Sequence, residues 1–231
     1  MKVGVVVFPG SNCDHDAWYA VSENLHQQAE FIWHDAGSVG DVDAVILPGG
    51  FAYGDYLRCG AIAKFSPVMS AVKRFAQDGG LVLGLCNGFQ ILTEAGLLPG
   101  ALVRNSKLKY LCRTIPVEIA TAHSPFTRQG REGQILHLPI AHGEGCYIAE
   151  ERVLDQLEAE DRVVLRYASE CNGSMRAIAG IVNEERNVMG MMPHPERAAD
   201  PLVGGTDGLV ILGSLVSGAR PHSSQLASVS A

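Results

Sequence analysis

The sequence predicts an α/β fold: a mostly parallel open sheet flanked by helices, with a nucleophile elbow at the end of one strand. Strand-like and helix-like segments alternate up to Gly100, which is typical of parallel sheets with right-handed crossover connections. Residues 84–88 (GLCNG) lie between an apolar run and a helical pattern, which is the context of a strand–turn–helix elbow. Beyond Gly100, extended segments with little helix between them predict a smaller, partly antiparallel sheet at one edge.

The first half of the chain supplies the parallel strands. Residues 2–8 (KVGVVVF) form a continuous, mostly β-branched run, typical of a strand that is buried on both faces. Pro9 and Gly10 end this strand, and Ser11 or Asn12 can cap the helix that follows. Apolar side chains at helical spacing form one face of that helix: Trp18, Val21 and Leu25. The other elements predicted in this half are two strands, a helix that begins with a proline, and the strand before the elbow, over 30–34, 44–47, 67–77 and 81–85.

The second half is richer in extended segments. Five are predicted as strands, over 113–119, 135–142, 163–167, 177–182 and 188–192. A helix over 206–216 then closes the fold. Nothing in the chain has the composition of a linker, so we expect a single domain over residues 1–219. The last segment, 220–231, is polar and Ser-rich, and we expect a mobile tail there.

Composition limits the class of function. The net charge of −7 and the pI near 5.6 argue against a nucleic-acid-binding protein, which would carry a basic stripe. No stretch has the pattern of a signal peptide or a membrane span, so we expect a cytoplasmic protein. The six cysteines include no C-x-x-C pair, and no His or Cys cluster has zinc-ligand spacing. We therefore expect free thiols and no metal site.

Cys86 is the candidate nucleophile. Gly84 and Gly88 flank it two residues away on each side, and they allow a tight turn without Cβ clashes. The N-terminus of the helix after the turn favours the thiolate, which is the reactive form of cysteine. A buried structural cysteine at a strand end is the alternative, but the glycine pair and the strand–turn–helix context favour the nucleophile.

The second candidate element is the turn at Gly49 and Gly50, which follows a predicted parallel strand. Open α/β sheets bind their ligands at the carboxyl ends of the parallel strands, and glycines at these ends leave backbone N–H groups accessible. We expect the amides of Gly50 and Asn87 to form an oxyanion hole, with Gly49 as a substrate contact. A plain Gly-Gly turn is the alternative, and it would be favoured if this pair stood alone.

The third candidate element is His194 with Glu196. Prolines on both sides of His194 exclude helix and hold the chain extended, which places residues i and i+2 on the same side. Glu196 would then orient the imidazole and support its protonated form. A core histidine beside a surface glutamate is the alternative; the flanking prolines and the separate elbow cysteine make it the weaker one.

These residues carry a family resemblance. The chain resembles the triad (class I) glutamine amidotransferases, and most closely the glutaminase subunits of phosphoribosylformylglycinamidine synthases of de novo purine synthesis. The motifs of the resemblance span about the first nine-tenths of the chain: FPGSNCD (8–14), PGGFAYGDYLRCGAIA (48–63), GLCNGFQIL (84–92), GLLPGAL (96–102), AHGEG (141–145), AGIVNEERNVMGMMPHPER (179–197) and DGL (207–209). Most other triad amidotransferases have Leu after the nucleophile, so Asn87 points to this subunit.

The resemblance implies a role for each matching residue. Cys86 would be the nucleophile, His194 the base and acid, and Glu196 the residue that orients His194. Further substrate contacts are implied for Gln90 on the elbow helix and for the AHGEG loop, with Arg58 as a weaker candidate for the α-carboxylate: Gln90, His142, Gly143, Glu144 and Arg58. A contact with a partner subunit is an equally good explanation of Arg58.

The same resemblance implies an activity and partners. The chain would hydrolyse L-glutamine through a Cys86 thioester, and its ammonia would pass to an ATP-dependent synthetase subunit, with a small third subunit expected in the complex. No G-x-x-x-x-G-K-[ST] loop is present, so we expect no cofactor in this chain and ATP with Mg²⁺ in the synthetase. Two alternatives remain at this stage, a cysteine peptidase or stress-response hydrolase on a related sheet, and a scaffold subunit with a dead site.

Overall fold

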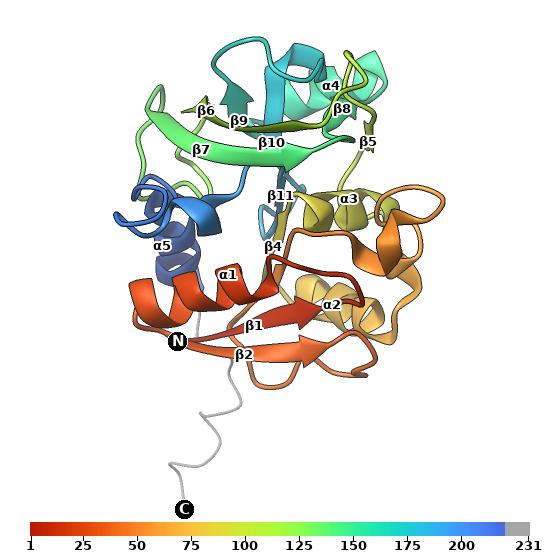
Figure 1. Cartoon of the computed structure of the whole chain (residues 1–231), viewed down its shortest axis with the longest axis vertical. Coiled ribbons are helices and arrows are strands. Elements are labelled where there is room, and N and C mark those ends of the chain that lie inside the picture. The colour runs from red at the N-terminus through yellow and green to blue at the C-terminus, as the bar shows by residue number, and fades with distance from the viewer. Residues whose placement is uncertain (220–231) are drawn as a thin grey trace, which may run out of the picture.

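The structure, a computed structural model, describes residues 1–219. The tail expected over 220–231 lies outside the described residues. Figure 1 shows a twisted sheet that runs through the whole molecule, with helices packed on both of its faces. The sheet has nine strands in the order β2-β1-β3-β4-β11-β10-β9-β6-β7, and β5 pairs with β8 in a separate two-stranded sheet.

The parallel half of the sheet comes from Val- and Leu-rich runs that are buried on both faces. It comprises five strands: β1 (Lys2–Val7), β2 (Gln28–Trp33), β3 (Ala44–Leu47), β4 (Leu81–Leu85) and β11 (Val188–Met191). All neighbouring pairs among them are parallel. β11 was expected with the antiparallel strands, but it pairs in parallel with β4, with Met191 opposite Leu85. This pairing brings the segment after Met191 next to the elbow.

The remaining strands of the large sheet are antiparallel to their neighbours. They are β6 (Leu111–Ile119), β7 (Ile135–His142), β9 (Val163–Tyr167) and β10 (Ile178–Val182). The predicted fold class is confirmed, and the antiparallel strands extend the same sheet. The small separate sheet, β5 (Ala101–Val103) with β8 (Cys146–Ile148), is antiparallel and had no counterpart in the predicted elements.

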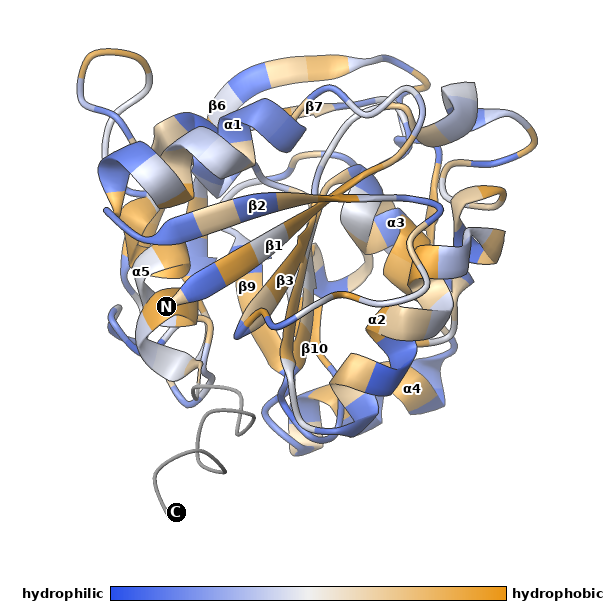
Figure 2. Ribbon diagram, turned by 90° about the horizontal axis from the view of Figure 1, so that it is seen from below, coloured by the Kyte–Doolittle hydropathy of each residue, from blue (hydrophilic) through white to orange (hydrophobic). Residues whose placement is uncertain are grey.

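Helices cover the sheet in two layers, which Figure 2 shows on either side of the apolar strands. One core lies under α2 (Pro67–Gln77), α3 (Asn87–Glu94) and α4 (Glu151–Ala159), and the other lies under α1 (Asp14–Tyr19) and α5 (Leu209–Gly218). Successive residues of a strand alternate between the two cores: Val45 and Leu47 pack on the first, and Ala44 and Ile46 on the second.

Two helix predictions need correction. The N-cap position of α1 is Cys13, not Ser11 or Asn12, and no side chain caps the helix. Before Leu25, the last apolar residue of the predicted helix face, the helix widens into a π-helical turn over Ala20–Asn24. α4 was not predicted because it is short and strongly charged, and its buried residues are Leu154 and Leu157.

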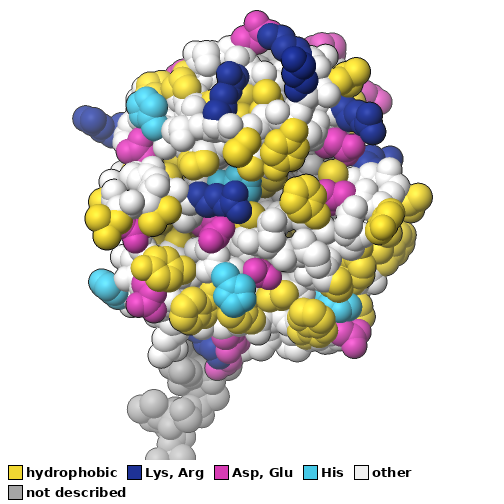
Figure 3. Space-filling view, in the orientation of Figure 1, with side chains coloured by type: hydrophobic (Ala, Val, Ile, Leu, Met, Phe, Trp, Pro, Cys, Tyr) yellow, Lys and Arg dark blue, Asp and Glu magenta, His cyan; other side chains and the backbone are white. Residues whose placement is uncertain are grey.

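The surface and the cysteines agree with the composition. On the face drawn in Figure 3, acidic and basic side chains intermix, without a continuous basic stripe. All six cysteines are free thiols, as expected. Among residues 1–219, no helix is both long and apolar enough to cross a bilayer.

Candidate active site

Cys86 lies at the turn between β4 and α3, in a backbone conformation that non-glycine residues rarely adopt, with φ 49° and ψ −101°. The flanking glycines let strand and helix approach each other closely. A β-carbon on Gly88 would lie 2.0 Å from the carbonyl oxygen of Leu47, and one on Gly84 would lie 2.8 Å from the backbone of Gly88. The amide of Cys86 donates to the carbonyl of Met191 at 2.7 Å, which joins the elbow to β11. The structure therefore contains the predicted elbow.

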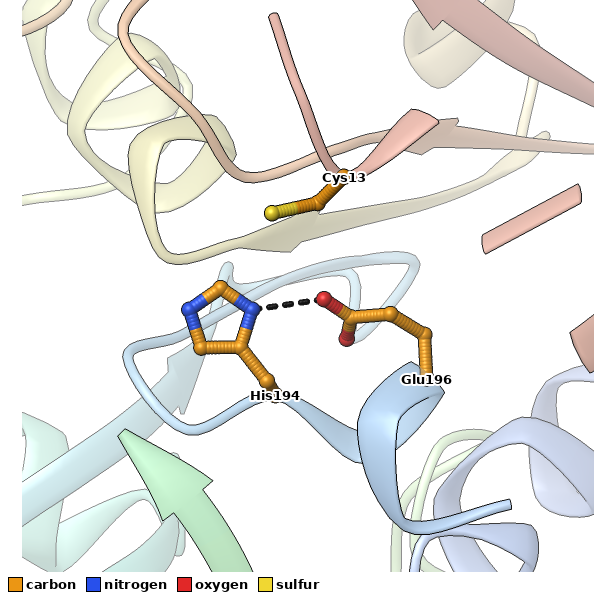
Figure 4. Close-up of side chains that lie close together, drawn as sticks. All are labelled: Cys13, His194 and Glu196. Carbon is orange, nitrogen blue, oxygen red and sulfur yellow. Dashed lines mark hydrogen bonds and ion pairs between the residues drawn. The ribbon is translucent and has the colours of Figure 1, made fainter. Parts of the chain in front are cut away.

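His194 and Glu196 form a buried hydrogen-bonded pair. His194 Nδ1 lies 2.6 Å from Glu196 Oε1, and their side chains are 2% and 0% exposed (Figure 4). The prediction of an extended chain was wrong, because Pro195–Ala198 is a 3-10 turn with Pro195 at its first position. The pair still forms, since the turn brings the Glu196 carboxylate beside the Nδ1 atom of the ring. His194 is also anchored through its amide, which donates to the Pro139 carbonyl of β7 at 2.8 Å.

The electrostatics of the pair favour imidazolium. Burial lowers the pKa of His194, but the negative charges of Glu196 and of a Cys86 thiolate outweigh it and raise that pKa well above its usual value. Nε2 has no hydrogen-bond partner among residues 1–219, so it is the nitrogen available for proton transfer. Cys86 is 5% exposed, and its sulfur lies 3.7 Å from the carbonyl oxygen of Ala141 near the end of β7.

The predicted oxyanion-hole residues flank the elbow. Gly50 has φ 132°, a conformation that favours glycine, and a β-carbon there would lie 2.6 Å from the amide nitrogen of Asn12. Asn87 is the first residue of α3, where the backbone N–H has no intrahelical acceptor. Gly49 lies against the catalytic pair, because a β-carbon on it would lie 2.7 Å from His194 Cε1. These positions are compatible with an oxyanion hole, which stays a prediction.

Gln90 is buried with both ends of its amide engaged. Its Oε1 accepts from the Asn87 side chain at 2.9 Å, and its Nε2 donates to the Glu144 carbonyl at 2.6 Å. Gln90 therefore links the elbow helix to the loop of Gly143 and Glu144. Arg58 makes two hydrogen bonds to the carboxylate of Glu94, which weighs against its role as an α-carboxylate ligand.

His142 is buried and neutral. Burial, and then the charge of His194, lower the pKa of His142 to about 4. Asn105 Oδ1 lies 3.1 Å from His142 Nδ1 and also accepts from the Gly145 amide. The Nδ1 atom is then the protonated one, and Nε2, which has no partner among residues 1–219, carries the free lone pair.

The sequence analysis missed Cys13. It is 2% exposed and lies beside the histidine–glutamate pair, where burial raises the pKa of its thiol (Figure 4). Arg197 Nη2 donates to Cys13 Sγ at 3.1 Å, and Arg197 Nε pairs with Asp16 at 3.0 Å. Potential metal-ligand atoms of Cys13, His194 and Glu196 lie within 4.8 Å of one another, a grouping that local spacing could not indicate because Cys13 comes from the other end of the chain. The histidine and glutamate of this cluster are bonded to each other, as expected of a catalytic pair.

A small pocket opens beside the same loop. Its volume is about 230 Å³, and its lining combines two basic residues with the ring of an exposed tyrosine: Arg104, Leu108, Lys109, Tyr110, Gly143 and Glu144. Burial and the charge of Cys86 raise the pKa of Tyr110. The pocket shares Gly143 and Glu144 with the loop to which Gln90 is bonded. The sequence did not predict this pocket, because its basic residues, Arg104 and Lys109, lie outside the motifs of the family resemblance.

Residues 1–204 match the family described as the CobB/CobQ-like glutamine amidotransferase domain. The chain belongs to this glutamine amidotransferase family. The amidotransferase is 55% identical to the phosphoribosylformylglycinamidine synthase subunit PurQ of Salinibacter ruber over 225 residues, which covers 94% of this chain and 96% of that protein. It is 55% identical to PurQ of Alkaliphilus metalliredigens over 208 residues, with 90% and 92% covered. Among solved structures, it matches a chain of PurLQS from Thermotoga maritima with a TM-score of 0.86 and 42% identity, covering 94% and 97% of the two chains.

The geometry of this amidotransferase suits acyl transfer from an amide. A thiol at a helix N-terminus, an imidazole with one free nitrogen and a buried carboxylate are the groups that a cysteine nucleophile, its base and a residue that orients the base require. Gly50 and Asn87 are the predicted sources of two backbone N–H donors next to the elbow. The arrangement weighs against the scaffold alternative, because all three residues of the predicted triad are present and each of them is buried.

Proposed function

We propose that this chain is the glutaminase subunit of a phosphoribosylformylglycinamidine synthase. The observation that carries the proposal is the buried set of Cys86, His194 and Glu196 at the elbow of a chain that is 55% identical to PurQ proteins over nearly its whole length. The substrate of this site is L-glutamine, and the products are glutamate and ammonia.

The reaction proceeds in two stages. The Cys86 thiolate attacks the side-chain amide carbon of glutamine, and the Gly50 and Asn87 amides stabilise the negative charge that develops on oxygen. His194 gives its Nε2 proton to the leaving nitrogen, ammonia departs and a thioester remains. Neutral His194 then takes a proton from water, which attacks the thioester; glutamate leaves, and the thiolate and imidazolium are restored. Glu196 holds the imidazole and stabilises its protonated form throughout.

The ammonia serves a partner in this proposal. The Thermotoga maritima relative comes from a structure of PurLQS, which supports a synthetase subunit and a small third subunit as partners of this chain. The synthetase uses ATP and Mg²⁺ to convert formylglycinamide ribonucleotide to the amidine, and this chain itself uses no cofactor. Six free thiols fit a reducing compartment, so we place the complex in the cytoplasm.

The test is Cys86→Ala in the assembled complex. We expect it to abolish glutamine-dependent synthesis and to leave ammonia-dependent synthesis intact. Cys171→Ala, which removes a half-buried thiol elsewhere, is the matched control and keeps both activities. Glutamine-dependent synthesis by the Cys86→Ala complex would show that the nucleophile assignment is wrong. Hydrolysis of peptides in place of glutamine would instead support the peptidase alternative.

A further inference from the structure

The side chain of Asn87 is buried, with 2% of the residue exposed, and all of its hydrogen-bonding groups point to named partners. Its Oδ1 accepts from the Ala52 amide at 3.1 Å. Its Nδ2 donates to Asp55 Oδ1 at 3.1 Å and to Gln90 Oε1 at 2.9 Å. Asn87 is therefore the point at which the elbow helix is bonded to the loop that carries Gly50.

That loop is strained. In addition to Gly50, three non-glycine residues have positive φ: Tyr53 (55°), Asp55 (52°) and Leu57 (73°). Such conformations cost energy for L-residues and persist only where the surroundings hold them. The tip of the loop has little burial to hold it, since Tyr56 is 73% and Leu57 is 93% exposed.

Two sets of bonds hold the loop from opposite sides. On one side, carbonyls of the segment after β1 accept from the amides of Phe51 and Tyr53. On the other side, Asn87 holds Ala52 and Asp55. Because these bonds alternate along the loop immediately after Gly50, losing the Asn87 set leaves the direction of the Gly50 amide fixed from one side only.

We propose that the Asn87 side chain is a positioning residue that builds the oxyanion hole: its backbone supplies one N–H donor, and its side chain holds the loop that supplies the other, at Gly50. The inference rests on the proposed glutaminase function and adds a role for a side chain that the triad does not use. One residue thereby links both donors, because its backbone supplies the first and its side chain is bonded to Ala52 and Asp55, in the loop directly after the second.

The same network extends past the oxyanion hole. Gln90, which accepts from Asn87 Nδ2, donates to the Glu144 carbonyl at 2.6 Å. The Asn87 side chain therefore also bonds, through one intermediary, to the loop after β7 that borders the nucleophile. Removing it releases two walls of the site together, and this predicts a loss in kcat and a smaller rise in KM for glutamine.

The first experiment compares two reactions of the same thiol. Glutamine hydrolysis passes through an oxyanion, whereas alkylation by iodoacetamide displaces iodide from a saturated carbon and forms none. In the assembled complex, we expect Asn87→Leu to lower kcat for glutamine about 10²-fold, the typical effect of losing one oxyanion donor. The rate of Cys86 alkylation and ammonia-dependent synthesis should stay within about twofold of wild type.

The second experiment exchanges the amide of Asn87 and the carboxylate of Asp55. Asn87→Asp keeps the acceptor for Ala52 but places a carboxylate opposite Asp55, so hydrolysis should fall at least as far as in Asn87→Leu. Adding Asp55→Asn restores a donor–acceptor pair with its direction reversed. We expect the double variant to regain about tenfold in kcat, with the remainder lost because the bond to Gln90 is still absent.

Each outcome decides between explanations. Unchanged kcat in Asn87→Leu overturns the proposal. A parallel fall in hydrolysis and alkylation also overturns it, because the side chain would then act on the thiol or on the fold. If kcat of the double variant is no higher than that of Asn87→Asp, the hydrogen bond between Asn87 and Asp55 does not contribute to the oxyanion hole. Retention of glutamine hydrolysis by Cys86→Ala would instead overturn the proposed function, whatever Asn87 does.

Discussion

The imidazole of His194 lies against the backbone of Gly49, so that a β-carbon at Gly49 would be 2.7 Å from His194 Cε1. This contact explains why the residue is glycine. Gly49 does not have the positive φ of its neighbour Gly50, so the turn itself does not require it. Glycine is required because the imidazole of His194 fills the space that a side chain would need. The contact also places the Gly49–Gly50 turn and the His194–Glu196 pair on the same side of the elbow.

Gly49→Ala should displace the imidazole of His194 from its position between Gly49 and Glu196. We expect kcat for glutamine to fall on the order of 10²-fold, the cost of a displacement of about 1 Å at a reacting group. Steady-state glutamate release by the complex measures this. Gly37→Ala is the control, since a β-carbon there meets no atom within 4 Å, and it should leave kcat unchanged. Equal activity of the two variants would contradict this account of Gly49.

Glu196→Gln removes a buried negative charge and keeps the shape of the side chain. Because the charge of Glu196 helps to raise the pKa of His194, the substitution should lower that pKa and reduce the imidazolium available to protonate ammonia. We expect kcat to fall on the order of 10²–10⁴-fold. The alkaline limb of the pH–rate profile should also move to lower pH. A profile that keeps its alkaline limb in place would show that Glu196 does not set the protonation of His194.

Gly88→Ala should destabilise the whole domain. A β-carbon at this position would lie 2.0 Å from the Leu47 carbonyl, so α3 and β3 would have to move apart. We expect a loss of about 3 kcal/mol in the free energy of unfolding and a fall of roughly 10 °C in Tm. Thermal unfolding followed by circular dichroism measures it, with Gly37→Ala again as the control. An unchanged Tm would mean that the elbow tolerates a wider separation than its contacts indicate.

His142 makes folding stability depend on pH. Its pKa is about 4 in the folded protein and about 6.5 when unfolded, so below pH 6.5 the unfolded chain binds a proton that the folded chain excludes. This contribution is fully present above pH 6.5 and is lost as pH falls toward 4. Between pH 7 and 5 we expect it to amount to about 2 kcal/mol. Urea unfolding of wild type and His142→Asn at both pH values isolates it, and identical pH dependence of the two proteins would contradict it.

The chain without its partners should be a weak glutaminase. The loop after Gly50 combines strained residues with an exposed tip at Tyr56 and Leu57, so a partner is expected to set its working conformation. We expect the synthetase, with its substrate and nucleotide, to raise glutamate release by more than about tenfold. Full activity of the purified chain alone would contradict this prediction.

Much of the site could be predicted because its parts are local. The elbow at Cys86 follows from the order of strand, turn and helix, and its glycines mark the points of closest approach. The His194–Glu196 pair was also anticipated, although through an extended chain where the structure has a 3-10 turn. The i, i+2 spacing in the sequence indicated that the two side chains are close, and the 3-10 turn determines the geometry of their hydrogen bond.

What the sequence determined by itself was therefore the fold class, the elbow that carries Cys86 and the pairing of His194 with Glu196, because each of these rests on neighbours within a few residues or on motifs. The tertiary structure decided which distant groups share the site. Cys13 meets His194, and Asn87 meets Asp55, only because parallel pairing stacks the carboxyl ends of β1, β3, β4 and β11 along one edge of the sheet. Such contacts depend on strand order and register, and no local pattern of residues specifies them.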